Sequence, residues 1–286
     1  MSYYYFRAFN LDRLNHLRLI GDSGAFSAHS QGGEVTVDEL AAWGTRWRHR
    51  LAWVAALDVI GDQKATRRNW QAAVSDHGLD AVPTIHYGTE PRALDWYADR
   101  GVDFVGLGGL VGLPLPKQMR WLVSVFKYQR ANHPAMRFHG WGITSDRAMH
   151  LPFYSVDSSG WTGAMRFGTV KLRDPRGPRH DLRVKLDGRD PYRPEVAALL
   201  AREYGVNLKA VAKSTAATRP GVSRLGALST SIHEQRIRAR HGPITPPSWG
   251  LLEPPTMGMH LHLADSDREG PSRLNALAAE RDDTPH

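Results

Sequence analysis

The sequence predicts an α/β protein with a TIM-like (β/α)8 barrel. Three observations predict this fold. Short apolar runs recur along residues 1–172, segments with helical periodicity separate them, and no Gly-x-Gly-x-x-Gly dinucleotide-binding pattern follows the first run. Six or seven strand–helix repeats within about 170 residues favour a compact barrel over an open sheet.

Six runs are expected to be strands, and a seventh is a candidate, because each is short, apolar or β-branched and bounded by Gly, Pro or Asp. They cover residues 17–21, 52–58, 81–86, 104–107, 136–141, 154–157 and, as the candidate seventh, 167–172. An eighth repeat cannot be placed from the sequence.

Helical segments alternate with these strands at residues 36–50, 65–77, 91–99 and 117–131. The first opens with Thr36-Val37-Asp38-Glu39, a capping-box pattern, and continues with apolar residues at helical spacing. Pro91 suits the first turn of the third helix.

The pattern changes after residue 172, so three domains or regions are expected. Residues 1–172 would form the barrel core with the active site, 173–263 a basic helical region that completes or flanks the barrel, and 264–286 a flexible tail. Within the second region, 173–193 reads as loops, 194–212 and 229–240 as helices, and 245–262 as irregular.

Composition excludes several classes of protein. The 286 residues are 41% hydrophobic and 23% charged, which is typical of a folded domain. No apolar run is long enough to span a bilayer, and the first residues do not resemble a signal peptide, so a cytoplasmic location, in a bacterial cell or a phage-infected host, and no membrane partner are expected. With no cysteine, the chain has no disulfide, thiolate zinc site or Cys nucleophile.

The charge predicts a polyanionic partner. The formal net charge is +8 and the isoelectric point about 9.9. Residues 166–245 contain 17 Lys and Arg against 7 Asp and Glu, a net charge of +10. A solvated basic surface is one interpretation and a phosphate-contacting region the other. In the second, the contacting residues are Arg166, Lys171, Arg173, Arg236, Arg238 and Arg240.

Polar or glycine-rich residues follow most of the predicted strands, and in a barrel these strand ends meet on one face. They are Asp22, Asp58, His86, the turn Gly108-Gly109-Leu110, His139 with Trp141, and Asp157. Carboxylates that converge can divide their roles between nucleophile and acid/base. Each residue also has a structural interpretation, as a helix cap, turn former or core side chain.

Five motifs resemble, in the same order, those of the tRNA-guanine transglycosylase (queuine tRNA-ribosyltransferase) superfamily. Asp22-Ser23-Gly24-Ala25-Phe26-Ser27 is similar to the family's Asp-Ser-Gly-Gly-Phe-Gln. The other four are Leu57-Asp58-Val59-Ile60, the glycine-rich segment 105–112, His139-Gly140-Trp141-Gly142-Ile143 and Val156-Asp157-Ser158. The resemblance covers roughly residues 18–170.

The resemblance implies that Asp157 attacks the anomeric carbon of a guanosine nucleotide and that Asp22 is the general acid/base. Asp58 would bind the base edge, with the N–H groups of Gly109 and Leu110 on its O6. Phe26 and Trp141 would sandwich the ring. His86 stands where the family has a glutamine, and Gly108 belongs to the glycine-rich turn that binds the base. The chemistry requires no metal and no cofactor.

The missing cysteines exclude the zinc subdomain of the tRNA-acting enzymes, so the chain most resembles the DNA-acting branch of phages and bacteria. The expected function is exchange of guanine in DNA for a 7-deazaguanine such as preQ0, after the guanosine is flipped or presented single-stranded. Three alternatives stay open: a zinc-less tRNA-guanine transglycosylase, a non-catalytic nucleic-acid-binding partner subunit, and an unrelated barrel hydrolase. Oligomeric state is not predicted.

Overall fold

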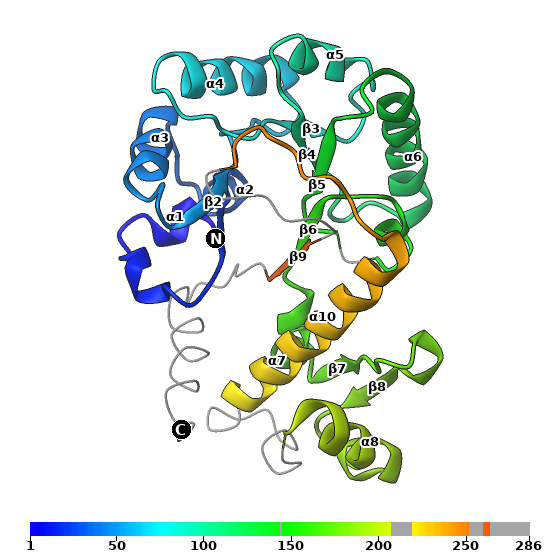
Figure 1. Ribbon diagram of the computed structural model, residues 1–286. Coiled ribbons are helices and arrows are strands. Elements are labelled where there is room, and N and C mark those ends of the chain that lie inside the picture. Colours follow the sequence, from blue (N-terminus) through cyan, green and yellow to red (C-terminus); the bar gives the residue numbers. More distant parts are fainter. Residues whose placement is uncertain (144, 207–218, 252–259, 264–286) are drawn as a thin grey trace.

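The computed structural model describes residues 1–143, 145–206, 219–251 and 260–263, which form a mixed α/β fold with parallel strands (Figure 1). A first pair contains β1 (Leu19–Gly21) and β2 (Leu51–Val54). A five-stranded parallel sheet follows in the order β3-β4-β5-β6-β9. Its strands are β3 Thr84–His86, β4 Phe104–Gly108, β5 Arg137–Gly140, β6 Ser155–Ser158 and β9 His260–Leu263.

Two isolated parallel bridges connect these sheets into one series. Ala55 pairs with Val82, which joins the β2 segment to the β3 segment, and Ser2 pairs with Asp22 on the other side of β1. The pairing therefore runs without interruption from residue 2 through β1 to β6 and on to β9. Within the described residues, no ladder or bridge joins β9 back to residue 2.

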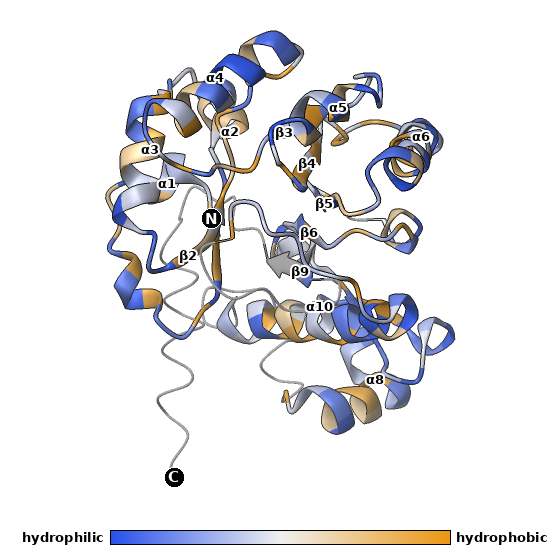
Figure 2. Cartoon of the chain, turned by 45° about the horizontal axis from the view of Figure 1, so that its top comes forward, coloured by the Kyte–Doolittle hydropathy of each residue, from blue (hydrophilic) through white to orange (hydrophobic). Residues whose placement is uncertain are grey.

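The six expected strands are confirmed, as are the helices between them. These helices are α3 Val37–Arg46, α4 Gln63–Ser75, α5 Ala93–Ala98 and α6 Leu115–Asn132, and they form an arc around the strands in Figure 2. The capping box of α3 is present, because Thr36 Oγ1 accepts from the Glu39 N–H while the Glu39 carboxylate accepts from the Thr36 N–H. Short helices not expected from the sequence are α1 Tyr3–Phe6, α2 Ala25–Ser30 and the 3-10 turns η1 Leu11–Leu14 and η2 Ala148–His150.

The candidate seventh strand is present, but it does not join the parallel series. Residues 169–172 form β7 (Thr169–Leu172), which pairs antiparallel with β8 (Leu182–Lys185) rather than with the parallel strands. Residues 173–193 were expected to be loops, but they contain β8. In this hairpin Val170 and Val184 are buried while Lys171 is half exposed, an alternation typical of a strand with one solvated face. The many charged residues on the solvated face made the segment read as loop.

A second hydrophobic core forms around this hairpin. It is built from β7, β8, α8 (Pro194–Leu199), the π-helix η6 (Leu200–Tyr204) and the first half of α10 (Arg219–His241). Val222 and Leu225 of α10 belong to this core, whereas Ile237 near the other end of α10 belongs to the main core. Helix α10 therefore connects the two cores. The remaining short elements are η3 Gly160–Thr162, α7 Gly163–Phe167, η4 Pro178–His180 and η5 Asp190–Tyr192.

The predicted helices 194–212 and 229–240 are confirmed as far as the structure describes them, in α8 with η6 and in α10. The expectation that 245–262 is irregular was wrong at its end, where β9 adds to β6 with His260 beside Ser155. Before β9, the N–H groups of Ser248 and Trp249 donate to Asp103, which ties this segment to the start of β4. The expected tail, 264–286, lies outside the described residues.

The elements leave no candidate for a membrane span: among residues that the structure describes, no helix combines the length and the apolar character needed to cross a bilayer.

Candidate active site

The structure brings the three predicted aspartates together at the carboxyl ends of parallel strands. Asp22 directly follows β1, Asp58 follows β2, and Asp157 lies within β6. The negative charges of Asp157 and Asp58 both act on Asp22. Asp58 and Asp157 lie 36 and 135 positions after Asp22 in the chain, and the three carboxyl groups share one electrostatic environment, here called the carboxylate cluster.

Asp22 is the member of the carboxylate cluster with a strongly shifted acidity. Burial, and then the charges of Asp157 and Asp58, raise the pKa of Asp22 to about 6. Its backbone is fixed by a hydrogen bond from its N–H to the Met1 carbonyl and by one from the Tyr3 N–H to its own carbonyl. A carboxylic acid with a pKa near 6 can both donate and accept a proton close to neutral pH.

Asp157 is held from two sides. The Gly142 N–H donates to its Oδ1 at 2.6 Å, and His139 Nε2 lies 3.7 Å from the same oxygen. Burial lowers the pKa of His139, which favours its neutral form, and Ser155 Oγ lies 2.8 Å from its Nδ1. Gly142 has φ +65°, and a Cβ there would lie 2.7 Å from a Val111 methyl, so the turn that presents this N–H requires glycine.

Asp58 accepts a hydrogen bond on each carboxylate oxygen. Ser23 Oγ lies 3.1 Å from Oδ1, and His86 Nε2 lies 2.7 Å from Oδ2. The Asp58 side chain is 20% exposed and that of His86 is 8% exposed. His86 Nδ1 is buried without a hydrogen-bond partner among the described residues. Ser23 of the first Asp motif and His86 of β3 therefore orient Asp58, and its side chain stays partly exposed.

The glycine-rich segment makes room for Trp141. The Trp141 indole N–H donates to Thr84 Oγ1 at 3.1 Å, and a Cβ at Gly106 would lie 2.3 Å from that nitrogen. Trp141 also packs edge-on against His139, with ring centroids 4.2 Å apart. Only a residue without a side chain at position 106 permits this placement of the indole.

The turn after β4 offers unused donors. Gly108 ends β4 and accepts from the Tyr87 N–H, Gly109 has φ +70°, and the Leu110 side chain is buried in the main core. Neither the Gly109 nor the Leu110 N–H donates to an acceptor in the described parts of the chain. Gly109 is exposed and has no side chain, so an acceptor such as a carbonyl oxygen can approach the main chain of this turn.

Exposed apolar side chains surround the carboxylate cluster, and sequence reasoning identified only one of them. They follow the ends of β1, β2, β3 and β4 within six residues and are Phe26, Val59, Ile60, Tyr87 and Val111, here called the apolar rim. Phe26 is 66% exposed and makes no ring contact with Trp141 in the described structure. The expected sandwich is therefore not closed. Apolar residues just after predicted strands are the signal that could have found the rim.

The predicted phosphate-contacting residues divide into two groups. Lys171, Arg173 and Arg236 form ion pairs with Asp146 and Asp181, at distances of 2.6 to 3.6 Å. Hydrogen bonds from His233, Arg173 and Lys171 outweigh burial and hold the pKa of Asp146 well below its ordinary value. Arg166, Arg238 and Arg240 are exposed, and Arg238 lies 3.7 Å from Glu234. Arg173 and Arg236, whose side chains are 12% and 15% exposed, are therefore not part of a solvated basic surface.

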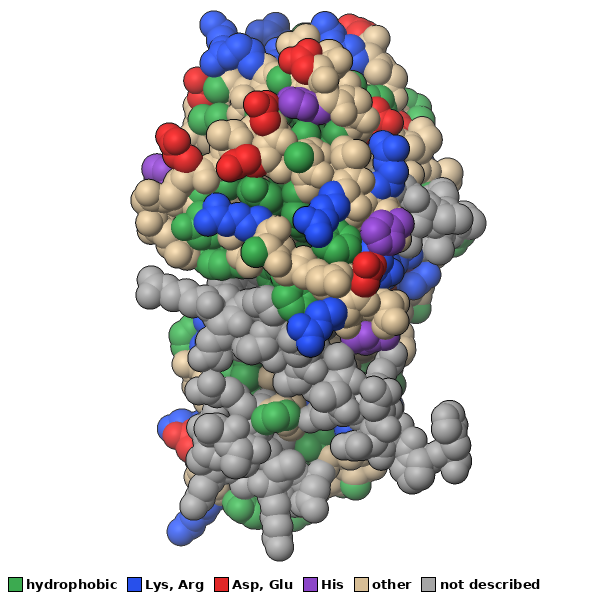
Figure 3. Space-filling view, turned by 90° about the vertical axis from the view of Figure 1, so that its left-hand side faces the viewer, with side chains coloured by type: hydrophobic (Ala, Val, Ile, Leu, Met, Phe, Trp, Pro, Cys, Tyr) green, Lys and Arg blue, Asp and Glu red, His purple; other side chains and the backbone are tan. Residues whose placement is uncertain are grey.

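Charge elsewhere is mixed. On the face that Figure 3 shows, the described lysine and arginine side chains are interspersed with acidic ones. No group of three or more His, Asp or Glu side chains suited to hold a metal ion occurs among the residues that the structure describes.

No protein-family model matches this chain, and no curated protein or solved structure is similar enough to it to count as a match.

Proposed function

We propose that the protein is a transglycosylase that exchanges guanine in DNA for a 7-deazaguanine through a covalent aspartyl–glycosyl intermediate. The observation that carries the proposal is the pairing of Asp22, whose pKa is raised to about 6, with Asp157, held by the Gly142 N–H. Two carboxyl groups in one site with different environments are the arrangement used for an acid/base and a nucleophile. The five motifs that resemble the tRNA-guanine transglycosylase superfamily support it.

The proposal includes a (β/α)8-like barrel. The uninterrupted series of parallel pairings contains eight segments, from residue 2 through β1 to β6 and on to β9, which is the number such a barrel needs. Closure would bring β9 beside residue 2. The candidate site would then lie at the carboxyl-terminal face, where barrel enzymes carry their chemistry.

In the first step, an Asp157 oxygen forms a bond to the anomeric carbon as the bond to the guanine nitrogen breaks. The proton of Asp22 goes to the leaving base. In the second step the incoming base gives its ring N–H proton to Asp22, and that nitrogen displaces Asp157. Two displacements retain the configuration of the sugar.

Base binding follows from the remaining groups. Asp58, oriented by Ser23 and His86, is suited to accept hydrogen bonds from the N1–H and exocyclic amine of guanine. The unpaired N–H groups of Gly109 and Leu110 would hold the O6 of the base. The exposed Phe26 ring would close over the base opposite Trp141, and the apolar rim would contact neighbouring bases exposed by flipping.

The test is exchange of radiolabelled guanine into DNA and, in parallel, into unmodified tRNA. The wild type is compared with Asp157→Asn, which keeps an oxygen for the Gly142 N–H but removes the nucleophile, and with the exposed Asp99→Asn as control. We expect label in DNA only, a loss of at least about 1,000-fold in Asp157→Asn, and no change in the control. Label in tRNA alone would favour the zinc-less tRNA enzyme. Nucleic-acid binding without exchange would favour the non-catalytic subunit, and release of base without exchange a hydrolase.

A further inference from the structure

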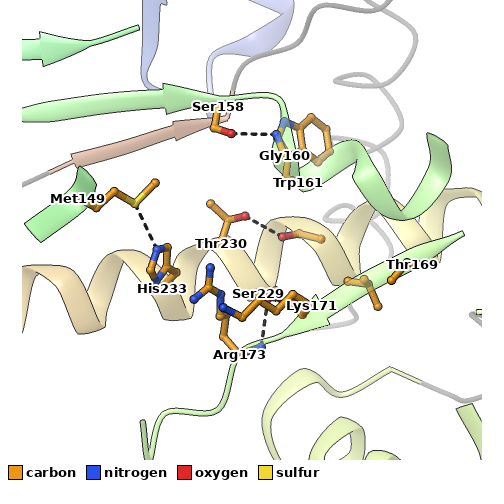
Figure 4. Close-up of a pocket in the computed structure, with 12 residues that line it drawn as sticks. Met149, Ser158, Gly160, Trp161, Thr169, Lys171, Arg173, Ser229, Thr230 and His233 are labelled. Carbon is orange, nitrogen blue, oxygen red and sulfur yellow. Dashed lines mark hydrogen bonds between the residues drawn. The ribbon is translucent and has the colours of Figure 1, made fainter. Parts of the chain in front are cut away.

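A cavity of about 170 Å³ lies between the end of β6, strand β7 and helix α10 (Figure 4). It is lined by Lys171 of β7, by Arg173 directly after β7, by Thr230 and His233 of α10, and by Ser158 of β6. None of these residues belongs to the carboxylate cluster. Its lining is rich in hydrogen-bond donors, which suits an anionic or strongly polar occupant.

The charges around the cavity do not cancel. Lys171, Arg173 and Arg236 carry three positive charges, and Asp146 and Asp181, to which they are paired, carry two negative ones. One net positive charge remains beside a partly enclosed space. The Lys171 side chain is 47% exposed, so it can turn from Asp146 toward an incoming anion without exposing a buried group.

His233 adds a buried donor or acceptor that the protein itself does not satisfy. Its side chain is 10% exposed, and Nε2 lies 3.2 Å from both Asp146 Oδ1 and Met149 Sδ. Its Nδ1 is buried and has no hydrogen-bond partner in the described structure. His233 therefore forms a buried part of the cavity wall, and the contacts to a ligand come from Lys171, Arg173 and Ser158.

The cavity is lined by Ser158, which directly follows the proposed nucleophile in the chain. Side chains alternate along a strand, so Ser158 faces away from Asp157 and toward α10. Ser158 Oγ accepts from the Gly160 N–H at 2.9 Å, which leaves the Ser158 hydroxyl proton free to donate into the cavity.

We propose that this cavity binds a phosphate group, the phosphodiester next to the nucleotide whose sugar is attacked by Asp157. That the phosphate belongs to the nucleic-acid substrate rests on the proposed function. That the cavity binds a phosphate group rests only on the residues that line the cavity. Lys171, Arg173 and Ser158 supply the contacts. Their role is to position the flipped nucleotide, because a phosphate fixed one residue from the nucleophile limits where its sugar can lie.

The first arm of the test uses inorganic phosphate, titrated by phosphorus NMR into the wild type, Lys171→Gln and Lys185→Gln. Lys185 is an exposed lysine on the neighbouring strand β8 that does not line the cavity, so it is a matched control for charge. We expect at least about fivefold weaker binding in Lys171→Gln and unchanged binding in Lys185→Gln. Equal binding by all three proteins, or none by the wild type, would overturn the proposal. Ser158→Ala, which removes the hydroxyl donor from the cavity with little risk to folding, is a second variant for the same titration.

The second arm uses a guanine-containing oligonucleotide with one neutral methylphosphonate linkage beside the target guanine. We expect KM for the wild type to rise and the Lys171→Gln enzyme to be insensitive to the change. The slope of log affinity against log salt should fall by about one in Lys171→Gln. Equal sensitivity of both enzymes to the neutral linkage would contradict a phosphodiester source. Binding of inorganic phosphate with no base exchange on any nucleic acid would instead contradict the proposed function.

Discussion

At the residue scale, the environment of Asp22 makes its ionised form unfavourable. Its pKa is raised from 3.8 to about 6, chiefly by burial, so the folded protein holds this proton more tightly than the unfolded chain. The resulting stability is fully present below about pH 4 and is lost as pH rises through 6. An ionised Asp22 therefore destabilises the fold at neutral pH.

Asp22→Asn should accordingly be more stable than the wild type and inactive. We expect its free energy of unfolding to exceed that of the wild type by about 1–3 kcal/mol at pH 7.5 and to equal it near pH 4. Urea unfolding at the two pH values measures the difference, and the exposed Asp99→Asn is the control. A variant less stable than wild type at pH 7.5 would contradict the conclusion that burial and neighbouring negative charges make the ionised Asp22 unfavourable.

At the element scale, the placement of Trp141 depends on the absence of a side chain in the middle of β4. Gly106→Ala would put a methyl group 2.3 Å from the indole nitrogen and 2.8 Å from Thr84 Oγ1. We expect a loss of about 1–3 kcal/mol in stability and displacement of the indole, seen as a tryptophan fluorescence shift. Gly163→Ala, where a Cβ would lie 4.0 Å from the Phe167 ring, is the control and should leave both stability and fluorescence unchanged. An unshifted spectrum in Gly106→Ala would refute the packing argument.

The β7–β8 hairpin is fastened to α10 by Asp181. This carboxylate is 5% exposed and accepts from Arg236 at 2.6 and 3.0 Å and from the Asp174 N–H at 3.1 Å. Asp181→Asn leaves buried guanidinium groups without their counter-charge, so we expect a loss of about 2–4 kcal/mol in urea unfolding. Glu195→Gln removes an exposed partner of Arg193, and less than about 1 kcal/mol should be lost. Equal losses would show that the Asp181 pairing is no more than a surface contact.

At the scale of the whole molecule, the predictable parts are those specified by local sequence. Strands β1 to β6 were found because buried parallel strands read as short apolar runs, and α3 because its capping box is contiguous. Strands β8 and β9 were missed, since a charged hairpin and a four-residue His-Leu repeat acquire their partners only in the fold.

In the candidate site, too, the features specified by local sequence were predictable and those that depend on the fold were not. Asp22, Asp58 and Asp157 were found from their positions after apolar runs. The Gly142 N–H on Asp157 and the Ser23 hydroxyl on Asp58 were not, because each contact spans 15 or more residues and depends on how the strand ends meet. The ion pairs of Lys171, Arg173 and Arg236 were not predicted either, because a basic composition does not show which carboxylates lie beside each basic side chain.

The most direct test of the central claim is to find the covalent intermediate. The wild type and Asp157→Asn are incubated with a guanine-containing DNA oligonucleotide without an incoming base, denatured, and analysed by intact mass and peptide mapping. We expect an adduct with the mass of enzyme plus oligonucleotide less guanine, mapped to Asp157 and missing in Asp157→Asn. Base exchange without any adduct, or an adduct on another residue, would contradict it.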